Sequence, residues 1–157
     1  MSGARTNAIR RLAEAGIECE VLEYDLSEED FSAEAVAAQL GIPPDQVFKT
    51  LVAVGPGGPV LAVVPAASEL DLKRLAAHLG ARKVSLAATA DLMNLTGFRR
   101  GAVTALGLDR GYPVVLDELA TVHDRIAVSA GARGVQVRLT VGDYCRLTGA
   151  DVADIAR

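Results

Sequence analysis

The chain has 157 residues, a length typical of one domain with a substantial core, and we expect residues 1–157 to form a single domain. Half of the residues are hydrophobic, which argues against intrinsic disorder. The net charge of −4, with no Trp, three Phe and three Tyr, argues against a protein that grips nucleic acid through bulk positive charge or aromatic stacking.

Cysteine usage and the apolar runs indicate a soluble, cytoplasmic protein. Cys19 and Cys145 lack the spacing of a metal site, so we expect both thiols to be reduced. The first residues hold no apolar segment of the kind found in a secretory signal. The longest apolar run, 60–67, is interrupted by Pro65 and is too short to span a bilayer.

Apolar periodicity and helix-capping residues predict helices and strands in alternation. Thr6, Ser32, Asp71 and Thr140 mark helix starts, and glycines follow the predicted helices. In chain order we expect a helix at 6–15, a strand at 19–24, a helix at 32–40, strands at 46–54 and 59–64 joined as a hairpin, a helix at 71–79, a short strand at 83–86, a short helix at 90–95, strands at 112–116, 125–129 and 135–139, a helix at 140–147 and a turn in the tail 151–157. This mixture of hairpins and helical crossovers indicates an α+β (mixed α/β) domain around one central, curled sheet.

The strand at 46–54, QVFKTLVAV, carries one cation among apolar residues. Because a strand alternates faces, Lys49 shares a face with Val47, Leu51 and Ala53. If this face is buried, the ammonium has to be paired or to open into a cleft, where it would bind or polarise an anionic group. The strand by itself favours the simpler interpretation, a lysine at a sheet edge that reaches water and blocks edge pairing.

A second unusual segment is the glycine-punctuated stretch 97–111, which has neither a helical nor a strand period. Loops of this length in a compact domain are often functional. The segment holds Arg99 and Arg100, and backbone N–H groups of such a loop can also face a ligand. Like the pairs Lys73-Arg74 and Arg82-Lys83, the pair Arg99-Arg100 is most simply solvated surface. Arg133, at the tip of a later turn, is either a solvated charge or a phosphate contact.

Other catalytic or binding arrangements have weaker support. His123 and Ser129, with Asp117 or Asp124, contain the ingredients of a hydrolase triad, but no nucleophile elbow surrounds the serine. The two histidines are distant and the carboxylates are scattered, so we expect no metal and no cofactor. The G-x-x-G at 131–134 matches the loop of RNA-binding KH modules, but it lies between two strand-like runs, which favours a hairpin turn.

The order of these features resembles the YbaK/EbsC family, the stand-alone aminoacyl-tRNA deacylases related to the editing domain of bacterial prolyl-tRNA synthetase. The similarity runs nearly end to end and is most specific in two blocks, DQVFKTL at 45–51 and SAGARG at 129–134. Weaker pieces are TNAI at 6–9, LG at 40–41, LDLK at 70–73, GARKV at 80–84, the loop at 101–107, GD at 142–143 and ADIAR at 153–157. Among the branches of the family, the Cys-tRNA(Pro) deacylases are the most similar.

The resemblance implies a mixed sheet, partly closed into a barrel and flanked by helices. It also implies hydrolysis of the ester that joins a wrong amino acid to the 3′ end of tRNA, with Cys-tRNA(Pro) as the expected substrate and prolyl-tRNA synthetase as the expected partner. Lys49 matches the family's essential lysine. The positions implied to line or adjoin the pocket are Tyr24, Phe31 or Ser32, Thr50, Gly101, Ala102, Ser129 and Gln136.

Such a reaction suits the residue types. The substrate is anionic beside the carbonyl to be cleaved, and a desolvated ammonium assisted by backbone groups stabilises negative charge developing there. No side chain is an obvious nucleophile. In the cysteine-specific branch the substrate's own thiol is thought to attack its carbonyl, and that route needs positioning more than a triad.

Two departures from the family pattern leave the amino acid open. Ala105 stands where the family's Gly-x-x-x-Pro loop has proline, and this change can loosen the pocket or shift its specificity. Gln136 stands where the similar branch has an aspartate, which removes a charge able to orient Lys49 or an amino group. The alternatives are therefore another mischarged pair, such as Ala-tRNA(Pro) or a mischarged serine, and a non-catalytic module that binds aminoacyl-tRNA or a synthetase. The sequence does not indicate an oligomeric state.

Overall fold

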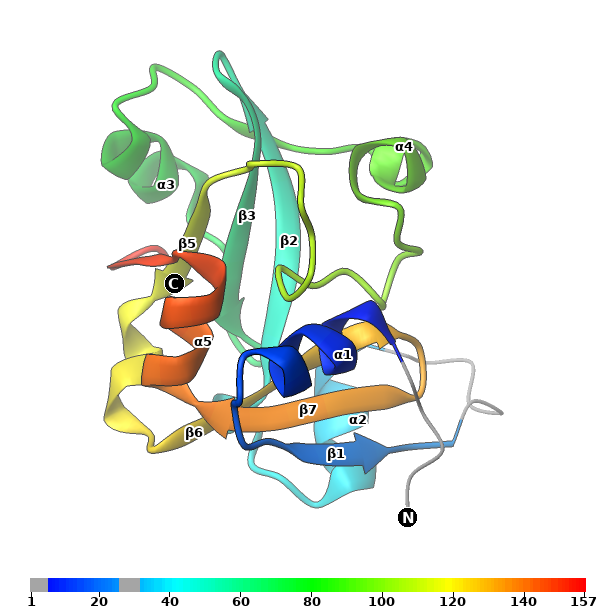
Figure 1. The fold of residues 1–157 in the computed structure, drawn as a ribbon. Coiled ribbons are helices and arrows are strands. Elements are labelled where there is room, and N and C mark those ends of the chain that lie inside the picture. Colours follow the sequence, from blue (N-terminus) through cyan, green and yellow to red (C-terminus); the bar gives the residue numbers. More distant parts are fainter. Residues whose placement is uncertain (1–5, 26–31) are drawn as a thin grey trace.

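The computed structural model describes residues 6–25 and 32–157, which form two β-sheets with helices around them (Figure 1). The smaller sheet is antiparallel, in the order β1-β7-β6, and the larger sheet is mixed, in the order β4-β2-β3-β5-β8. The strands are β1 (Glu20–Glu23), β2 (Phe48–Gly55), β3 (Gly58–Pro65), β4 (Ser85–Leu86), β5 (Val114–Asp117), β6 (Arg125–Ala132), β7 (Val135–Thr140) and β8 (Asp151–Ala153). The α+β class is confirmed.

The expected single, partly barrel-like sheet is divided in two. In the described part of the chain, a parallel bridge between Val47 and Ala127 joins the two sheets, and no closed barrel forms. Figure 1 shows the long β2–β3 hairpin rising away from the three-stranded sheet, with α3 and α4 on opposite sides of it. The sequence could not reveal this division, because short apolar runs do not specify which strands pair with one another.

Each long helix begins at the capping residue that the sequence marks. The helices are α1 (Asn7–Glu14), α2 (Ala33–Leu40), α3 (Leu72–Leu79), α4 (Leu92–Thr96) and α5 (Val141–Thr148). The side chains of Thr6, Ser32, Asp71 and Thr140 accept hydrogen bonds from backbone N–H groups at the starts of α1, α2, α3 and α5. Glycines in the left-handed conformation end the last three of these helices.

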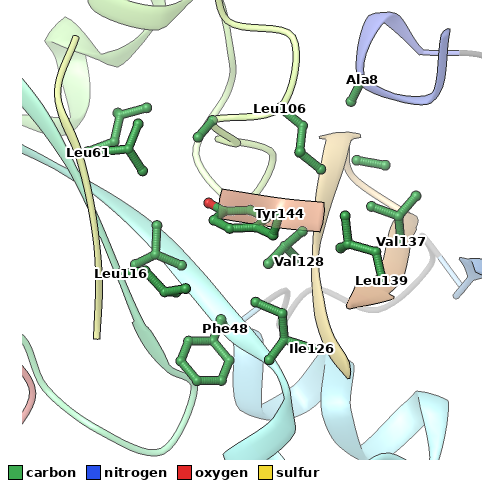
Figure 2. Close-up of a cluster of buried hydrophobic side chains, with 14 of the residues drawn as sticks. Ala8, Phe48, Leu61, Leu106, Leu116, Ile126, Val128, Val137, Leu139 and Tyr144 are labelled. Carbon is green, nitrogen blue, oxygen red and sulfur yellow. The ribbon is translucent and has the colours of Figure 1, made fainter. Parts of the chain in front are cut away.

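The main hydrophobic core lies where the two sheets face each other. Side chains of β2, β3 and β5 pack there against those of β6 and β7, while α1 and α5 contribute Leu12 and Tyr144, both fully buried. Figure 2 shows Tyr144 in the middle of this cluster, with Leu106 and Val128 beside its ring. A smaller cluster that includes Ala37 attaches α2 to the bridge between the sheets. This packing holds the walls of the cavity described below.

Tyr144 provides a test of this core. Its hydroxyl is buried and has no hydrogen-bond partner among the described residues, and an unpaired buried hydroxyl costs about 1–3 kcal/mol. We therefore expect Tyr144→Phe to raise the free energy of unfolding in urea at pH 7 by about 1 kcal/mol. A decrease would show instead that the hydroxyl is hydrogen-bonded in solution.

The same residue predicts a pH dependence. Burial raises the pKa of Tyr144, and the Cys145 thiolate adds a smaller effect in the same direction. The folded protein therefore keeps the phenolic proton where the unfolded chain, with a tyrosine pKa of about 10, loses it. The contribution of the protonated phenol to the free energy of unfolding is therefore fully present below pH about 10 and is lost as the pH rises above that value. Tyr144→Phe should make this loss of stability shallower.

The tail differs from its prediction. Instead of a turn, β8 pairs in parallel with β5, and the backbone N–H and C=O of Arg157 exchange hydrogen bonds of 2.8 and 3.0 Å with those of Glu69. Asp117, at the end of β5, is fully buried and accepts hydrogen bonds from the N–H groups of Ile155 and Ala156. A three-residue strand held by a distant carboxylate leaves almost no periodic signal in a sequence. Among the described residues, no helix is long and apolar enough to cross a membrane.

Candidate functional site

A cavity of about 700 Å³ opens beside β2. Its walls come from the start of α2, from β2, from the segment 86–92, from the loop 100–103, and from one residue each of β6 and β7. Five of the residues that the resemblance implies, far apart in the sequence, lie on this one cavity: Lys49, Thr50, Gly101, Ser129 and Gln136.

Lys49 enters the cavity wall from a strand with neighbours on both sides. β2 lies between β3 and β4, but β4 pairs only with Ala53 and Val54, so Lys49 lies beyond the end of β4. Near Lys49, β2 is therefore an unpaired edge of the sheet, as the solvated-edge interpretation supposes, but this edge borders the cavity. The Nζ atom of Lys49 lies 3.4 Å from the carbonyl oxygen of Ala66, a long contact for one of its three donors. The half-buried ammonium is thus placed to meet an anionic or carbonyl group in the cavity.

A tight turn carries Gly101 into the cavity wall. The N–H of Ala102 donates to the carbonyl oxygen of Arg99 at 2.9 Å, and Gly101 has φ +87°, a value that the third position of a type II turn requires and that favours glycine. The Ser129 hydroxyl donates to the carbonyl oxygen of Ala102 at 3.0 Å and accepts from the N–H of Gly131 at 3.1 Å. The serine therefore fastens the glycine turn to β6 where the register of β6 and β7 shifts.

Two polar atoms of the cavity wall are buried without a partner among the described residues. They are Oγ1 of Thr50 and Oε1 of Gln136, and Gln136 is only 6% exposed. Gln136 pairs with Ser129 across the β6–β7 ladder, so both side chains leave the sheet on the same face. A buried carbonyl oxygen without a donor is costly, and a ligand N–H or O–H in the cavity would remove that cost.

Three of the implied residues lie elsewhere or outside the described chain. Phe31 falls in 26–31, outside the described residues, while its alternative Ser32 lines the cavity and caps α2. Ala102 is buried and contributes its carbonyl oxygen to Ser129 rather than a wall atom. Tyr24 is half-buried beside the β6–β7 turn, where its N–H donates to the Gly134 carbonyl, and it is not among the residues that line the cavity.

The sequence did not predict the apolar part of the wall. Val36 of α2, Leu86 of β4 and Leu92 of α4 line the cavity. Arg100, which the sequence points out in the glycine-rich loop, lines it as well. Leu86 is 53% exposed and still lines the cavity. Whether an apolar residue faces a cavity or the core depends on how α2 and α4 pack, and helical periodicity does not reveal this.

The triad ingredients are separated and used elsewhere. Ser129 donates to a backbone carbonyl, Asp117 accepts from backbone N–H groups, and His123 lies 3.9 Å from the carboxylate of Asp45. The G-x-x-G at 131–134 forms the end of β6 and the turn into β7, as the hairpin interpretation predicts. Within the described residues, no group of three His, Cys, Asp or Glu side chains is arranged to hold a metal ion.

A sequence profile of the aminoacyl-tRNA editing domain matches residues 27–147. The chain belongs to the aminoacyl-tRNA editing domain family. It is 41% identical over 152 residues, covering 96% of this chain and 93% of the relative, to EbsC of Enterococcus faecalis, assigned as a Cys-tRNA(Pro)/Cys-tRNA(Cys) deacylase. It is 33% identical over 129 residues, covering 79% of this chain and 77% of the relative, to the multifunctional Ser/Thr-tRNA deacylase ProXp-y of Escherichia coli.

The fold agrees with this family. A crystal structure assigned as a trans-editing enzyme for prolyl-tRNA synthetase superposes with a TM-score of 0.84 and 28% identity, covering 98% of this chain and 99% of the other. The YbaK/EbsC resemblance read from the sequence is confirmed.

Ala105, one of the two departures from the family pattern, does not line the Lys49 cavity. Ala105, at the position of the editing family's loop proline, is 7% exposed and packs in the main core. It borders a separate cavity of about 240 Å³, near Arg11 and Asp109, and not the cavity of Lys49. Any effect of this alanine on the substrate must therefore pass through the backbone of the loop, whereas Gln136 faces the cavity directly.

Proposed function

We propose that this protein is a trans-editing hydrolase that cleaves the aminoacyl ester of mischarged tRNA, with Cys-tRNA(Pro) as its main substrate. The observation that carries the proposal is that Lys49, Gly101 of the glycine turn and Ser129, which is hydrogen-bonded to that turn, line one cavity. The identity to EbsC over nearly the whole chain supports the choice of substrate. Residues 1–157 would then act as one editing domain, in the cytoplasm, where tRNA is charged.

The cavity suits the end of a charged tRNA. A volume of about 700 Å³ lies within the usual range of small-ligand pockets, and it has room for an amino acid and part of the terminal adenosine. The Lys49 ammonium lies where it would stabilise the negative charge that develops on the ester carbonyl oxygen. Oε1 of Gln136 would accept a hydrogen bond from the substrate's α-ammonium, and the hydroxyl of Thr50 would pair with a second polar group of the substrate.

Two nucleophiles are compatible with this site: water and the thiol of the substrate. Water adds to the carbonyl carbon, the ester C–O bond breaks, and the 3′ oxygen leaves with a proton. Alternatively the substrate's thiol loses its proton and the thiolate attacks its own carbonyl carbon. The same ester C–O bond breaks, and the 3′ oxygen leaves with a proton, giving a thiolactone. Both routes need an oriented substrate and charge stabilisation more than a protein nucleophile, which suits a site whose serine is already hydrogen-bonded to a carbonyl.

A second candidate substrate is tRNA mischarged with serine or threonine. The unpartnered Thr50 and Gln136 oxygen atoms favour it, because a side-chain hydroxyl would hydrogen-bond to them, and the E. coli relative is a Ser/Thr-tRNA deacylase. Ala-tRNA(Pro) offers neither a thiol nor a hydroxyl to these atoms. A module that binds tRNA without cleaving it would leave the placement of Lys49 without a chemical role.

Prolyl-tRNA synthetase is the proposed partner. The net charge of −4 gives the protein little general attraction for RNA, so a synthetase that delivers the mischarged tRNA would assist it. The similar structure assigned as a trans-editing enzyme for that synthetase supports this choice.

Deacylation of a panel of purified tRNAs tests the proposal. We expect Cys-tRNA(Pro) to lose its amino acid fastest, Ser- and Thr-charged tRNAs more slowly, and Ala-tRNA(Pro) and correctly charged Pro-tRNA(Pro) most slowly. A substrate that lacks a polar group to which the site hydrogen-bonds should have a kcat/KM lower by more than about tenfold. Binding of tRNA without turnover of any substrate would contradict the proposal.

A further inference from the structure

The glycine turn carries two arginines, Arg99 and Arg100, to which the proposed ester chemistry gives no role. Arg99 and Arg100 occupy the first two positions of the turn closed by the Ala102 N–H to Arg99 carbonyl hydrogen bond, and both side chains are exposed. Arg100 also lines the Lys49 cavity. Two consecutive exposed arginines therefore belong to a turn that borders the cavity, and Lys49 lines the same cavity.

The backbone that carries these arginines is held in place. The carbonyl oxygen of Arg99 accepts from Ala102, that of Arg100 accepts from Nε of Arg133 at 2.7 Å, and that of Ala102 accepts from Ser129. The Arg133 contact also brings the side chain of a β6–β7 turn residue against the same segment. Long side chains on a fixed turn lose less entropy on binding than side chains on a mobile loop.

The two arginines are not used in ion pairs within the described chain. The ion pairs that involve arginine there use Arg11, Arg74, Arg138, Arg146 and Arg157. In that part of the chain neither Arg99 nor Arg100 has a carboxylate partner, although the protein is acidic overall. Guanidinium groups without a carboxylate partner are free to pair with phosphate, to which arginine donates two parallel hydrogen bonds.

We propose that Arg99 and Arg100 form a phosphate-binding rim for the single-stranded 3′ end of tRNA. The inference rests on the proposed function: with the aminoacyl ester against Lys49, the nucleotides before the terminal adenosine leave through the cavity mouth, and their phosphodiesters pass the two arginines. The rim provides local attraction for RNA that the net charge of −4 does not. It accounts for the basic pair in the glycine loop, which the ester chemistry leaves unused.

The test compares two double variants on two substrates. Arg99→Ala with Arg100→Ala removes the rim, and Arg82→Ala with Lys83→Ala removes the same charge from exposed residues that do not line the cavity. We expect the rim variant to raise the KM for Cys-tRNA(Pro) about tenfold with kcat within about twofold. The slope of log(kcat/KM) against log salt should become shallower by about 0.7 for each phosphate that the variant no longer neutralises.

The second substrate is the cysteinyl ester of adenosine, which has no phosphate. The Arg82→Ala, Lys83→Ala variant should hydrolyse it at the wild-type rate, and the rim variant should lose much less kcat/KM on it than on Cys-tRNA(Pro). Arg99→Lys with Arg100→Lys should keep most of the salt dependence on tRNA. A rim variant with wild-type KM and salt slope, or one that loses as much kcat/KM on the adenosine ester as on tRNA, would overturn the rim. Absence of turnover by the wild-type protein on both substrates would instead contradict the proposed function, so the two failures are distinguishable.

Discussion

Replacing Lys49 by alanine should lower kcat for deacylation of Cys-tRNA(Pro) by about 10² to 10³-fold while leaving the protein folded. The ammonium lies in the cavity wall with one long contact, at 3.4 Å to the Ala66 carbonyl oxygen, so little hydrogen bonding is lost when the side chain is removed. The loss is expected in kcat because the charge it stabilises develops only in the transition state. Single-turnover deacylation at saturating enzyme measures it directly.

Two further variants make this result specific. Lys49→Met keeps the length of the side chain without its charge and should be as inactive as Lys49→Ala. Lys73→Ala removes an exposed lysine on α3 and should react at the wild-type rate. Urea unfolding of Lys49→Met should stay within about 1 kcal/mol of the wild type, since a half-buried charge is replaced by an apolar group. Wild-type turnover by Lys49→Ala would exclude the ammonium from the mechanism.

The sequence predicted local structure well because local chemistry decides it. Thr6, Ser32, Asp71 and Thr140 each accept the backbone N–H that a helix start leaves unpaired, and that requirement is visible in four residues of sequence. The β2–β3 hairpin likewise follows from two apolar runs around a glycine-rich turn. Sheet order, the bridge at Val47 and the β8 strand depend on contacts between distant residues, and these were missed.

The same distinction applies to the site. Lys49 is conspicuous in sequence because an ammonium in an apolar strand needs an explanation, and the family blocks add Ser129 and Gly101. Nothing in the sequence distinguishes Leu86, exposed in the cavity wall, from the buried leucines of the core. Asp117 was a possible triad member by residue type, and only the fold shows its carboxylate enclosed by backbone N–H groups. Residue types that suit two roles are assigned by tertiary contacts.

Loss of the Asp117 carboxylate should strongly destabilise the protein. Its carboxylate is fully buried, with Oδ1 accepting from Ile155 and Ala156 at 2.9 and 2.8 Å and Oδ2 accepting from Leu119 at 2.9 Å. Asp117→Ala leaves three backbone donors without their acceptor in a place that water reaches poorly. We expect the free energy of unfolding in urea to fall by about 4 kcal/mol, and proteolysis to begin in the C-terminal tail.

Asp117→Asn separates this structural role from a catalytic one. The amide oxygen still accepts from the tail, but the NH₂ group faces a donor, so a smaller loss of about 2 kcal/mol is expected. Because Asp117 does not line the cavity, kcat per folded molecule should stay within about twofold, whereas a triad aspartate would lose about 10⁴-fold on this change.

Asp154→Ala is the matched control: it removes a 58% exposed carboxylate from the same tail, paired with Arg74, and should cost less than about 1 kcal/mol. Equal losses for Asp117→Ala and Asp154→Ala would show that the tail is not held by the buried carboxylate.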